Sequence, residues 1–132
     1  MATVLALARI PPLLLIVDDD PEVRMLLREL FVQKGYRVNV AEDGEAAMQF
    51  LEQNEPPSMI LLDLMMPGIM GTGVLSYLGS TPSLLNVPIA IVSGTPDLAP
   101  LGYHVFKKPL SFAPLLEFVR TTCDGPTLSD VA

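Results

Sequence analysis

The sequence predicts an α/β protein with a doubly wound, five-stranded parallel sheet, and three observations support this fold class. Short apolar runs typical of buried strands alternate along the chain with segments whose apolar residues recur at helical spacing. Such alternation is typical of right-handed βαβ crossovers. Polar side chains follow several of the apolar runs, and a parallel sheet of this kind places its site beyond the carboxyl ends of its strands. The length of 132 residues fits one domain with one hydrophobic core.

The first half of the chain contains three strand signals and two helix signals. Strands are predicted over residues 13–17, 36–41 and 59–62. The first helix begins at Asp20-Pro21-Glu22, which supplies an N-cap, a proline at the first position and an acid in the first turn. Gly35 is expected to end that helix. Asp43-Gly44 is predicted to form a turn before the second helix.

The second half contains two further strands with a short segment between them. A helix carrying Val74 and Leu78 precedes a strand over residues 89–92, and the fifth strand is predicted over residues 103–106. Phe112 begins the apolar stripe of the final helix. We expect a domain over residues 13–122, an N-terminal extension over 1–12 and a C-terminal tail over 123–132.

Composition argues against several classes of function. A net charge of −7 disfavours direct DNA binding and binding to anionic membrane surfaces, since both require a basic face. Cys123 and His104 are the only residues of their types, which excludes an intramolecular disulfide and disfavours zinc catalysis. Arg9 and Pro11-Pro12 interrupt the apolar N-terminal stretch, so we expect no signal peptide and no membrane span. A reducing, cytoplasmic setting follows.

Five polar residues follow the predicted strands and are expected at one edge of the sheet: Asp18, Asp19, Asp63, Ser93 and Lys108. The carboxylate oxygens of the three aspartates are hard ligands suited to Mg²⁺. A bound cation would also relieve the repulsion between neighbouring carboxylates. Lysine and serine could neutralise and hydrogen-bond the oxygens of a phosphoryl group. The set therefore predicts a site that holds Mg²⁺ and accepts a phosphoryl group on the lone aspartate.

Four motifs in order resemble the receiver domain of two-component response regulators, a CheY-like, flavodoxin-like fold. They are Asp18-Asp19, the run Ile-Leu-Leu-Asp63-Leu-Met-Met-Pro-Gly, Ser93-Gly94 and Lys108-Pro109, within residues 13 to 120. The resemblance implies that Asp63 is the phosphoacceptor, Ser93 the switch hydroxyl and Lys108 the phosphate contact before a cis-proline. It also implies that the metal is held by Asp18, Asp19, Asp63 and the backbone carbonyl of Met65.

The same resemblance implies the partners and the class of activity. A histidine kinase or a histidine phosphotransfer protein would supply the phosphoryl group, and the chain would be a signalling phosphoprotein rather than an enzyme. Output would pass to an unknown downstream protein through protein contacts, with neither DNA binding nor membrane attachment. A homodimer is one possibility that the sequence leaves open.

The chain also departs from the receiver pattern. Val105 stands where receivers carry an aromatic residue, and Phe106 should point to the opposite face of a regular strand. Met70 replaces an acid common before the following glycine. The interval from Ser93 to Lys108 contains Pro96 and Pro100 and can hold no more than about one helical turn. The helix that receivers carry between their fourth and fifth strands is therefore expected to be missing or vestigial.

Alternative interpretations remain open at this point. Lys107 could act in place of Lys108, although only the latter precedes a proline. The chain could be a phosphorylation-insensitive binding module that keeps the fold but not the switch. A hydrolase that uses an aspartyl phosphate is disfavoured, because Met65 occupies the position where such enzymes need a second acid. Residues 2–10 could be a flexible or edge segment, or could cover the surface left bare by a missing helix.

Overall fold

The computed structural model describes residues 10–124 of the chain. Residues 1–9 and 125–132 lie outside the described residues. The hypothesis that the first ten residues cover a bare surface, and most of the expected C-terminal tail, therefore fall on parts of the chain that the structure does not describe. In the described part, no helix is both long enough and apolar enough to cross a membrane.

Five strands form one parallel sheet in the order β2-β1-β3-β4-β5. The strands are β1 (Leu13–Val17), β2 (Arg37–Ala41), β3 (Met59–Leu62), β4 (Ile89–Ser93) and β5 (His104–Lys107). The order reverses after β2, so the carboxyl ends of β1 and β3 are neighbours. The predicted doubly wound parallel sheet is confirmed.

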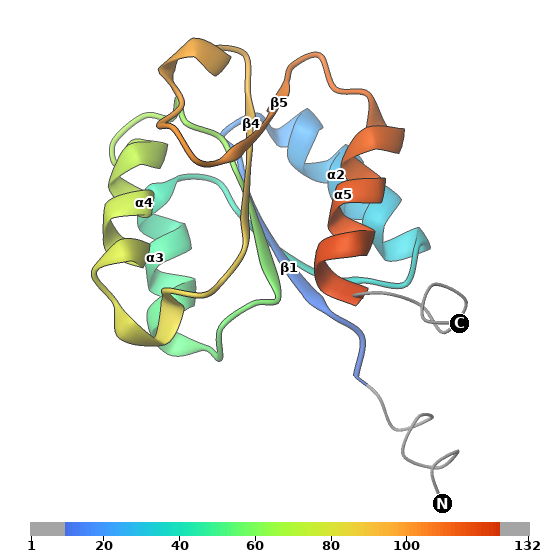
Figure 1. The fold of residues 1–132 in the computed structure, drawn as a ribbon, viewed down its shortest axis with the longest axis horizontal. Coiled ribbons are helices and arrows are strands. Elements are labelled where there is room, and N and C mark those ends of the chain that lie inside the picture. Colours follow the sequence, from blue (N-terminus) through green and yellow to red (C-terminus); the bar gives the residue numbers. More distant parts are fainter. Residues whose placement is uncertain (1–9, 125–132) are drawn as a thin grey trace, which may run out of the picture.

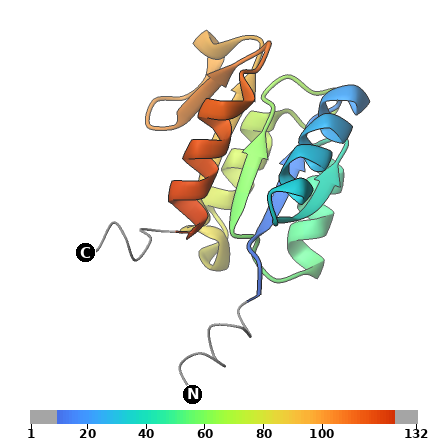
Figure 2. The ribbon, with the colours of Figure 1, turned by 90° about the vertical axis from the view of Figure 1, so that its right-hand side faces the viewer.

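Within residues 10–124, four α-helices cover the two faces of this sheet. They are α2 (Pro21–Gln33), α3 (Gly44–Gln53), α4 (Gly71–Gly79) and α5 (Phe112–Asp124). Figure 1 shows α3 and α4 on one side of the strands and α2 and α5 on the other. In Figure 2 the helices α2 and α5 lie on the viewer's side of the sheet. The inner strands β1, β3 and β4 are covered on both faces, which explains their hydrophobic runs, whereas the edge strands β2 and β5 also carry polar residues.

Helix starts agree with the local sequence signals, with one correction. The Asp20 side chain accepts a hydrogen bond from the Glu22 backbone N–H over 2.9 Å and caps α2, as predicted. Asp43-Gly44 is not a separate turn. Asp43 instead caps α3 by accepting from the Ala46 N–H over 2.7 Å, and Gly44 is the first helical residue. The correction arises because an aspartate before a helix-forming segment satisfies the unpaired N–H groups of the first turn.

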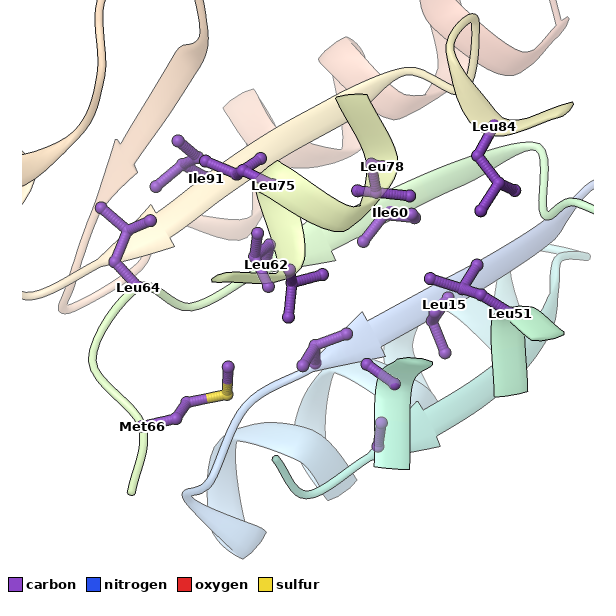
Figure 3. Packing of buried hydrophobic residues seen from close by; sticks show 14 residues of the cluster. Leu15, Leu51, Ile60, Leu62, Leu64, Met66, Leu75, Leu78, Leu84 and Ile91 are labelled. Atoms are coloured by element: carbon purple, nitrogen blue, oxygen red, sulfur yellow. The ribbon is translucent and has the colours of Figure 1, made fainter. Parts of the chain in front are cut away.

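Side chains that alternate along the strands form two hydrophobic clusters, one on each face. Toward α3 and α4 lies the cluster drawn in Figure 3, in which Leu15, Ile60, Leu62 and Ile91 of the sheet meet Leu75 and Leu78 of α4. Toward α2 and α5 lies the second cluster, which contains Leu14, Ile16, Leu61, Val92, Phe31 and Leu115. The two clusters hold the strand ends in fixed positions.

The crossover from β4 to β5 contains no α-helix, as predicted. Its one regular element is the single 3₁₀ turn η2 (Pro96–Leu98), whereas the other long loop of this half holds η1 (Pro82–Leu84). Figure 1 shows the crossover as a loop with this short turn, coloured orange. Leu98 and Leu101 in this loop are 59% and 99% exposed. These two apolar side chains of the crossover therefore lie at the surface and are not part of a packed helix face.

The fifth strand begins one residue later than predicted, at His104. Gly102 has a φ of +96° and keeps Tyr103 in the turn before the strand. Val105 pairs with Ile91 on the α4 face and remains 36% exposed. Phe106 faces the other way and packs against Phe118 of α5, with 5.5 Å between ring centroids. The prediction that this aromatic residue points to the opposite face is confirmed.

Candidate functional site

The register of the parallel strands brings the predicted site residues to one edge of the sheet. Val17 pairs with Leu62, so the next residues, Asp18 and Asp63, are neighbours, and the Asp63 N–H donates to the Val17 carbonyl over 2.9 Å. Lys108 follows β5 and donates its backbone N–H to the Ser93 carbonyl over 2.9 Å. Residues far apart in sequence therefore meet because each follows a strand of the same sheet.

Three carboxylates form the acidic part of the site. Ligand oxygens of Asp18, Asp19 and Asp63 all lie within 4.8 Å of one another. Asp18 and Asp63 are buried, whereas Asp19 is exposed at the mouth of the cluster. Asp18 is held on both sides, since one carboxylate oxygen accepts from the Asp20 N–H over 2.9 Å and its backbone carbonyl accepts from Arg24 over 2.8 Å. The Asp18 carboxylate is thus held in place, whereas the Asp19 carboxylate is exposed to solvent.

Lys108 supplies the cation of the site. Its ammonium nitrogen lies 2.6 Å from Asp18 Oδ2 and 3.5 Å from Asp63 Oδ2. The peptide bond to Pro109 is cis, as the resemblance implied. Lys107 is exposed on β5. Of the two neighbouring lysines, Lys108 is the one that contacts the acids.

The electrostatics of the site follow from this arrangement. Burial, followed by the negative charge of Asp18, raises the pKa of Asp63, and Lys108 and the Met65 N–H act in the opposite direction. Burial alone would lower the pKa of Lys108, but the hydrogen bond and charge of Asp18, followed by the charge of Asp63, raise it. The site therefore carries more negative charge than its single ammonium group neutralises.

The acidic cluster fits a divalent cation. Carboxylate oxygens are the hard ligands that Mg²⁺ prefers, and it is commonly held by one or two of them together with water. Burial and, after it, the charge of Asp18 raise the pKa of Asp63, and a cation would relieve the repulsion between the two carboxylates. The Met65 N–H donates to Asp63 Oδ1 over 3.3 Å, which places the Met65 backbone beside the Asp63 carboxylate. A ligand role for its carbonyl remains a prediction.

Ser93 lies at the end of β4 and is fully buried. Its hydroxyl oxygen is 3.1 Å from the hydroxyl oxygen of Thr95 and accepts the Thr95 backbone N–H over 3.0 Å. The sequence analysis assigned no role to Thr95. The signal that could have identified it is a hydroxyl residue two positions after the serine, a spacing at which side chain and backbone commonly bond.

Gly71 was noted in the sequence only as the glycine that follows Met70, and the structure shows a role for it. A Cβ atom at this position would lie 2.4 Å from the carbonyl oxygen of Asp63 and 2.6 Å from the Cα of Leu64. The Gly71 N–H also donates to the Leu64 carbonyl over 2.9 Å. The start of α4 therefore packs directly on the backbone of Asp63 and Leu64, and only glycine leaves the space for this approach.

Known proteins share this fold and resemble this chain in sequence. The family model described as the response regulator receiver domain matches residues 14–107. Among curated proteins, Rrf1 of Nitratidesulfovibrio vulgaris is 30% identical over 112 residues, which cover 83% of this chain and 80% of Rrf1. The response regulator MprA of Mycobacterium is 37% identical over 83 residues, 63% of this chain and 35% of MprA. Several matched relatives are thus much longer than this chain.

Solved structures agree with these matches. The response regulator TrrA of Thermotoga maritima, solved in complex with Mg²⁺-BeF, has a TM-score of 0.74 and 27% identity, over 84% of this chain and 98% of TrrA. A receiver domain of a Francisella response regulator has a TM-score of 0.73 and 26% identity, over 86% and 97% of the two chains. The fold, the order of the motifs and these matches together show that the chain belongs to the family of response regulator receiver domains.

Proposed function

We propose that Asp63 accepts a phosphoryl group from a histidine kinase or a histidine phosphotransfer protein, and that the chain signals as a response regulator through protein contacts. The observation that carries this proposal is the setting of Asp63. Its buried carboxylate has two further carboxylates within 4.8 Å and the ammonium of Lys108 at 3.5 Å. A nucleophile between a metal-binding cluster and a fixed cation is the arrangement that phosphoryl transfer requires.

In the proposed reaction a carboxylate oxygen of Asp63 attacks phosphorus, and the bond from phosphorus to the donor's nitrogen breaks. The product is an acyl phosphate, and the departing imidazole keeps the electron pair of the broken bond and takes up a proton. Lys108 can neutralise one phosphoryl oxygen, and Ser93 can donate its hydroxyl proton to another. Asp19, Asp63 and the Met65 carbonyl, with Asp18 behind them, would hold Mg²⁺, which would offset the remaining phosphoryl charge.

A surface beside the site supports a protein donor. A groove of about 560 Å³ lies between α2 and the segment after β5, and it is lined by Val23, Leu26, Leu27, Leu30, Lys108, Leu110 and Phe112. Leu26 is 56% exposed there, and Met25 nearby on the helix is 65% exposed. Because Lys108 belongs both to this groove and to the site, a helix that rests in the groove would bring its histidine close to Asp63.

Incubation with Mg²⁺ and acetyl phosphate tests the chemistry without a cognate kinase. We expect intact-mass spectrometry at low temperature to show the addition of one phosphoryl group, sensitive to hydroxylamine and absent from Asp63→Asn. Asp97→Asn is the matched control, since Asp97 is an exposed aspartate outside the acidic cluster. A label that persists in Asp63→Asn, or no label on the wild-type protein, would refute the proposal.

A second candidate function is a receiver-like binding module that phosphorylation does not switch. Two observations favour it: the crossover after β4 has no α-helix, and Val105 takes the position of the aromatic residue on β5. Amide hydrogen exchange with and without beryllofluoride and Mg²⁺ separates the two candidates. Changes in the residues 94–103 crossover support a switch, whereas changes confined to the site support the binding module. A cytoplasmic location, consistent with the single cysteine, is part of the proposal.

A further inference from the structure

The hydroxyl of Ser93 has one proton and two lone pairs, and its surroundings restrict how they are used. The Thr95 backbone N–H donates to Ser93 Oγ over 3.0 Å and occupies one lone pair. Thr95 Oγ1 lies 3.1 Å from the same oxygen, and either hydroxyl can be the donor. In the described part of the chain, Thr95 thus supplies every hydrogen bond recorded for the Ser93 side chain.

The contact between the two hydroxyls can run in either direction without movement of a heavy atom. Before phosphorylation, Ser93 can donate its proton to Thr95 Oγ1. When Ser93 donates to a phosphoryl oxygen on Asp63, that proton is no longer available, and Thr95 Oγ1 can donate to the second lone pair instead. The Ser93 oxygen is then bonded on all sides, with its proton directed at the phosphoryl group.

The position of Thr95 in the chain makes this reversal relevant to the crossover. Thr95 is exposed, although the hydroxyl that it contacts is fully buried. Its carbonyl accepts the Leu98 N–H over 3.1 Å and so closes the η2 turn. The residue that contacts the Ser93 hydroxyl is thus also the residue at which the η2 turn of the crossover begins.

We propose that Thr95 is a positioning residue, which orients the Ser93 proton toward a phosphoryl group on Asp63. This inference rests on the proposed function, since it requires Asp63 to carry the phosphoryl group. Thr95 does not itself contact the phosphoryl oxygens and acts through Ser93. A buried hydroxyl that loses one of its partners is costly, so the effect should be measurable.

The test compares four variants with the wild-type protein: Thr95→Val, Thr95→Ser, Ser93→Ala and the double variant Ser93→Ala/Thr95→Val. The rate of phosphorylation by acetyl phosphate and the affinity for beryllofluoride are measured for each at fixed Mg²⁺. Valine keeps the shape of threonine but cannot donate, and we expect a loss of about fivefold, the effect of one neutral hydrogen bond. Serine keeps the hydroxyl and should stay within about twofold of wild type.

The double variant decides whether Thr95 acts through Ser93. We expect Thr95→Val to have no further effect once the Ser93 hydroxyl is gone, because coupled residues are not additive. An equal loss in both backgrounds would overturn the inference, and so would a Thr95→Val protein that behaves as wild type. Thermal melting of each variant excludes a folding defect as the cause, and Thr95→Ala replaces the valine variant if the latter is unstable.

The same experiment separates failure of this inference from failure of the proposed function. If the wild-type protein is labelled on Asp63 but Ser93→Ala has no effect, the role of Thr95 is refuted and the phosphoacceptor stands. If the wild-type protein is neither labelled nor bound by beryllofluoride, the proposed function fails, and the inference fails with it.

Discussion

Lys108 lies closer to Asp18 than to Asp63, with 2.6 Å from its ammonium nitrogen to the first carboxylate and 3.5 Å to the second. The short contact is a charge-assisted hydrogen bond, whereas the longer one is at the limit of such an interaction. The lysine is therefore held by the neighbour of the proposed acceptor and is positioned beside the acceptor itself. This arrangement keeps a cation at the site while the Asp63 carboxylate makes only a long contact with it.

Asp18→Asn should lower the pKa of Asp63. The charge of Asp18 is the second cause of the raised pKa, after burial, and its removal also frees Lys108 to approach Asp63. NMR titration of the carboxyl carbons in the presence of EDTA measures this change. A pKa that stays the same or rises would show that the two carboxylates are not coupled.

Asp63→Asn should stabilise the metal-free protein, and increasingly so as pH rises. A carboxyl whose pKa is raised by folding binds more protons in the folded state, so its contribution to stability falls as pH rises through the folded pKa. Asparagine at this position does not ionise, so the variant does not lose this stability as the pH rises. We expect the melting temperature of Asp63→Asn to exceed that of the wild-type protein at pH 7, and the difference to shrink as the pH falls to about 4.

Calorimetry in EDTA at both pH values checks this prediction. Glu52→Gln is the control, because Glu52 is exposed near the end of α3, away from the acidic cluster. A wild-type protein more stable than Asp63→Asn at neutral pH without metal would contradict the prediction.

Mg²⁺ should raise the melting temperature of the wild-type protein. A cation that binds the folded cluster but not the unfolded chain stabilises by about 2.7 kcal/mol at one hundred times its dissociation constant. Asp63→Asn and Asp19→Asn should reduce the gain, whereas Glu52→Gln should keep it. A titration followed by differential scanning fluorimetry, with Na⁺ at matched ionic strength, measures the effect. An equal gain in every variant would indicate binding elsewhere.

Gly71→Ala should disrupt the site more than its size suggests. The added Cβ would meet backbone atoms of Asp63 and Leu64 at 2.4 and 2.6 Å, and backbone cannot move aside as a flexible side chain can. We expect a loss of about 1–3 kcal/mol of stability, as for overpacking in general, together with slower phosphorylation. Gly79→Ala is the matched control, because a Cβ there has open space. Similar behaviour of the two alanine variants would show that the close approach is not required.

Phe31→Ala tests the core that supports the site from the α2 and α5 side. Phe31 is fully buried and packs edge-on against Tyr36 and Phe112, with ring centroids 5.7 and 5.1 Å away. Removal of a buried aromatic side chain typically costs about 3–5 kcal/mol. Leu101→Ala, at a 99% exposed position, should change the free energy of unfolding by less than about 0.5 kcal/mol. Urea unfolding compares the two variants.

Much of the fold could be predicted because its signals are local. Continuous apolar runs identified the strands, and Asp20 with Pro21 identified the start of α2. Two prolines in the segment after Ser93 were enough to predict that no full α-helix connects β4 to β5. The errors were also local. Asp43-Gly44 was interpreted as a turn where it begins α3, since a cap and a turn use the same residue types.

The sequence by itself determined the fold class, the short crossover and the set of acids, serine and lysine at one sheet edge, because strand periodicity and proline restrict the backbone directly. Only the tertiary structure decided which of these groups touch. Asp18 and Lys108, 90 positions apart, meet through the register of the sheet. The bond from Thr95 to Ser93 and the close approach of Gly71 to Asp63 depend on distances of a few ångströms. Such distances follow from packing, which no local pattern encodes.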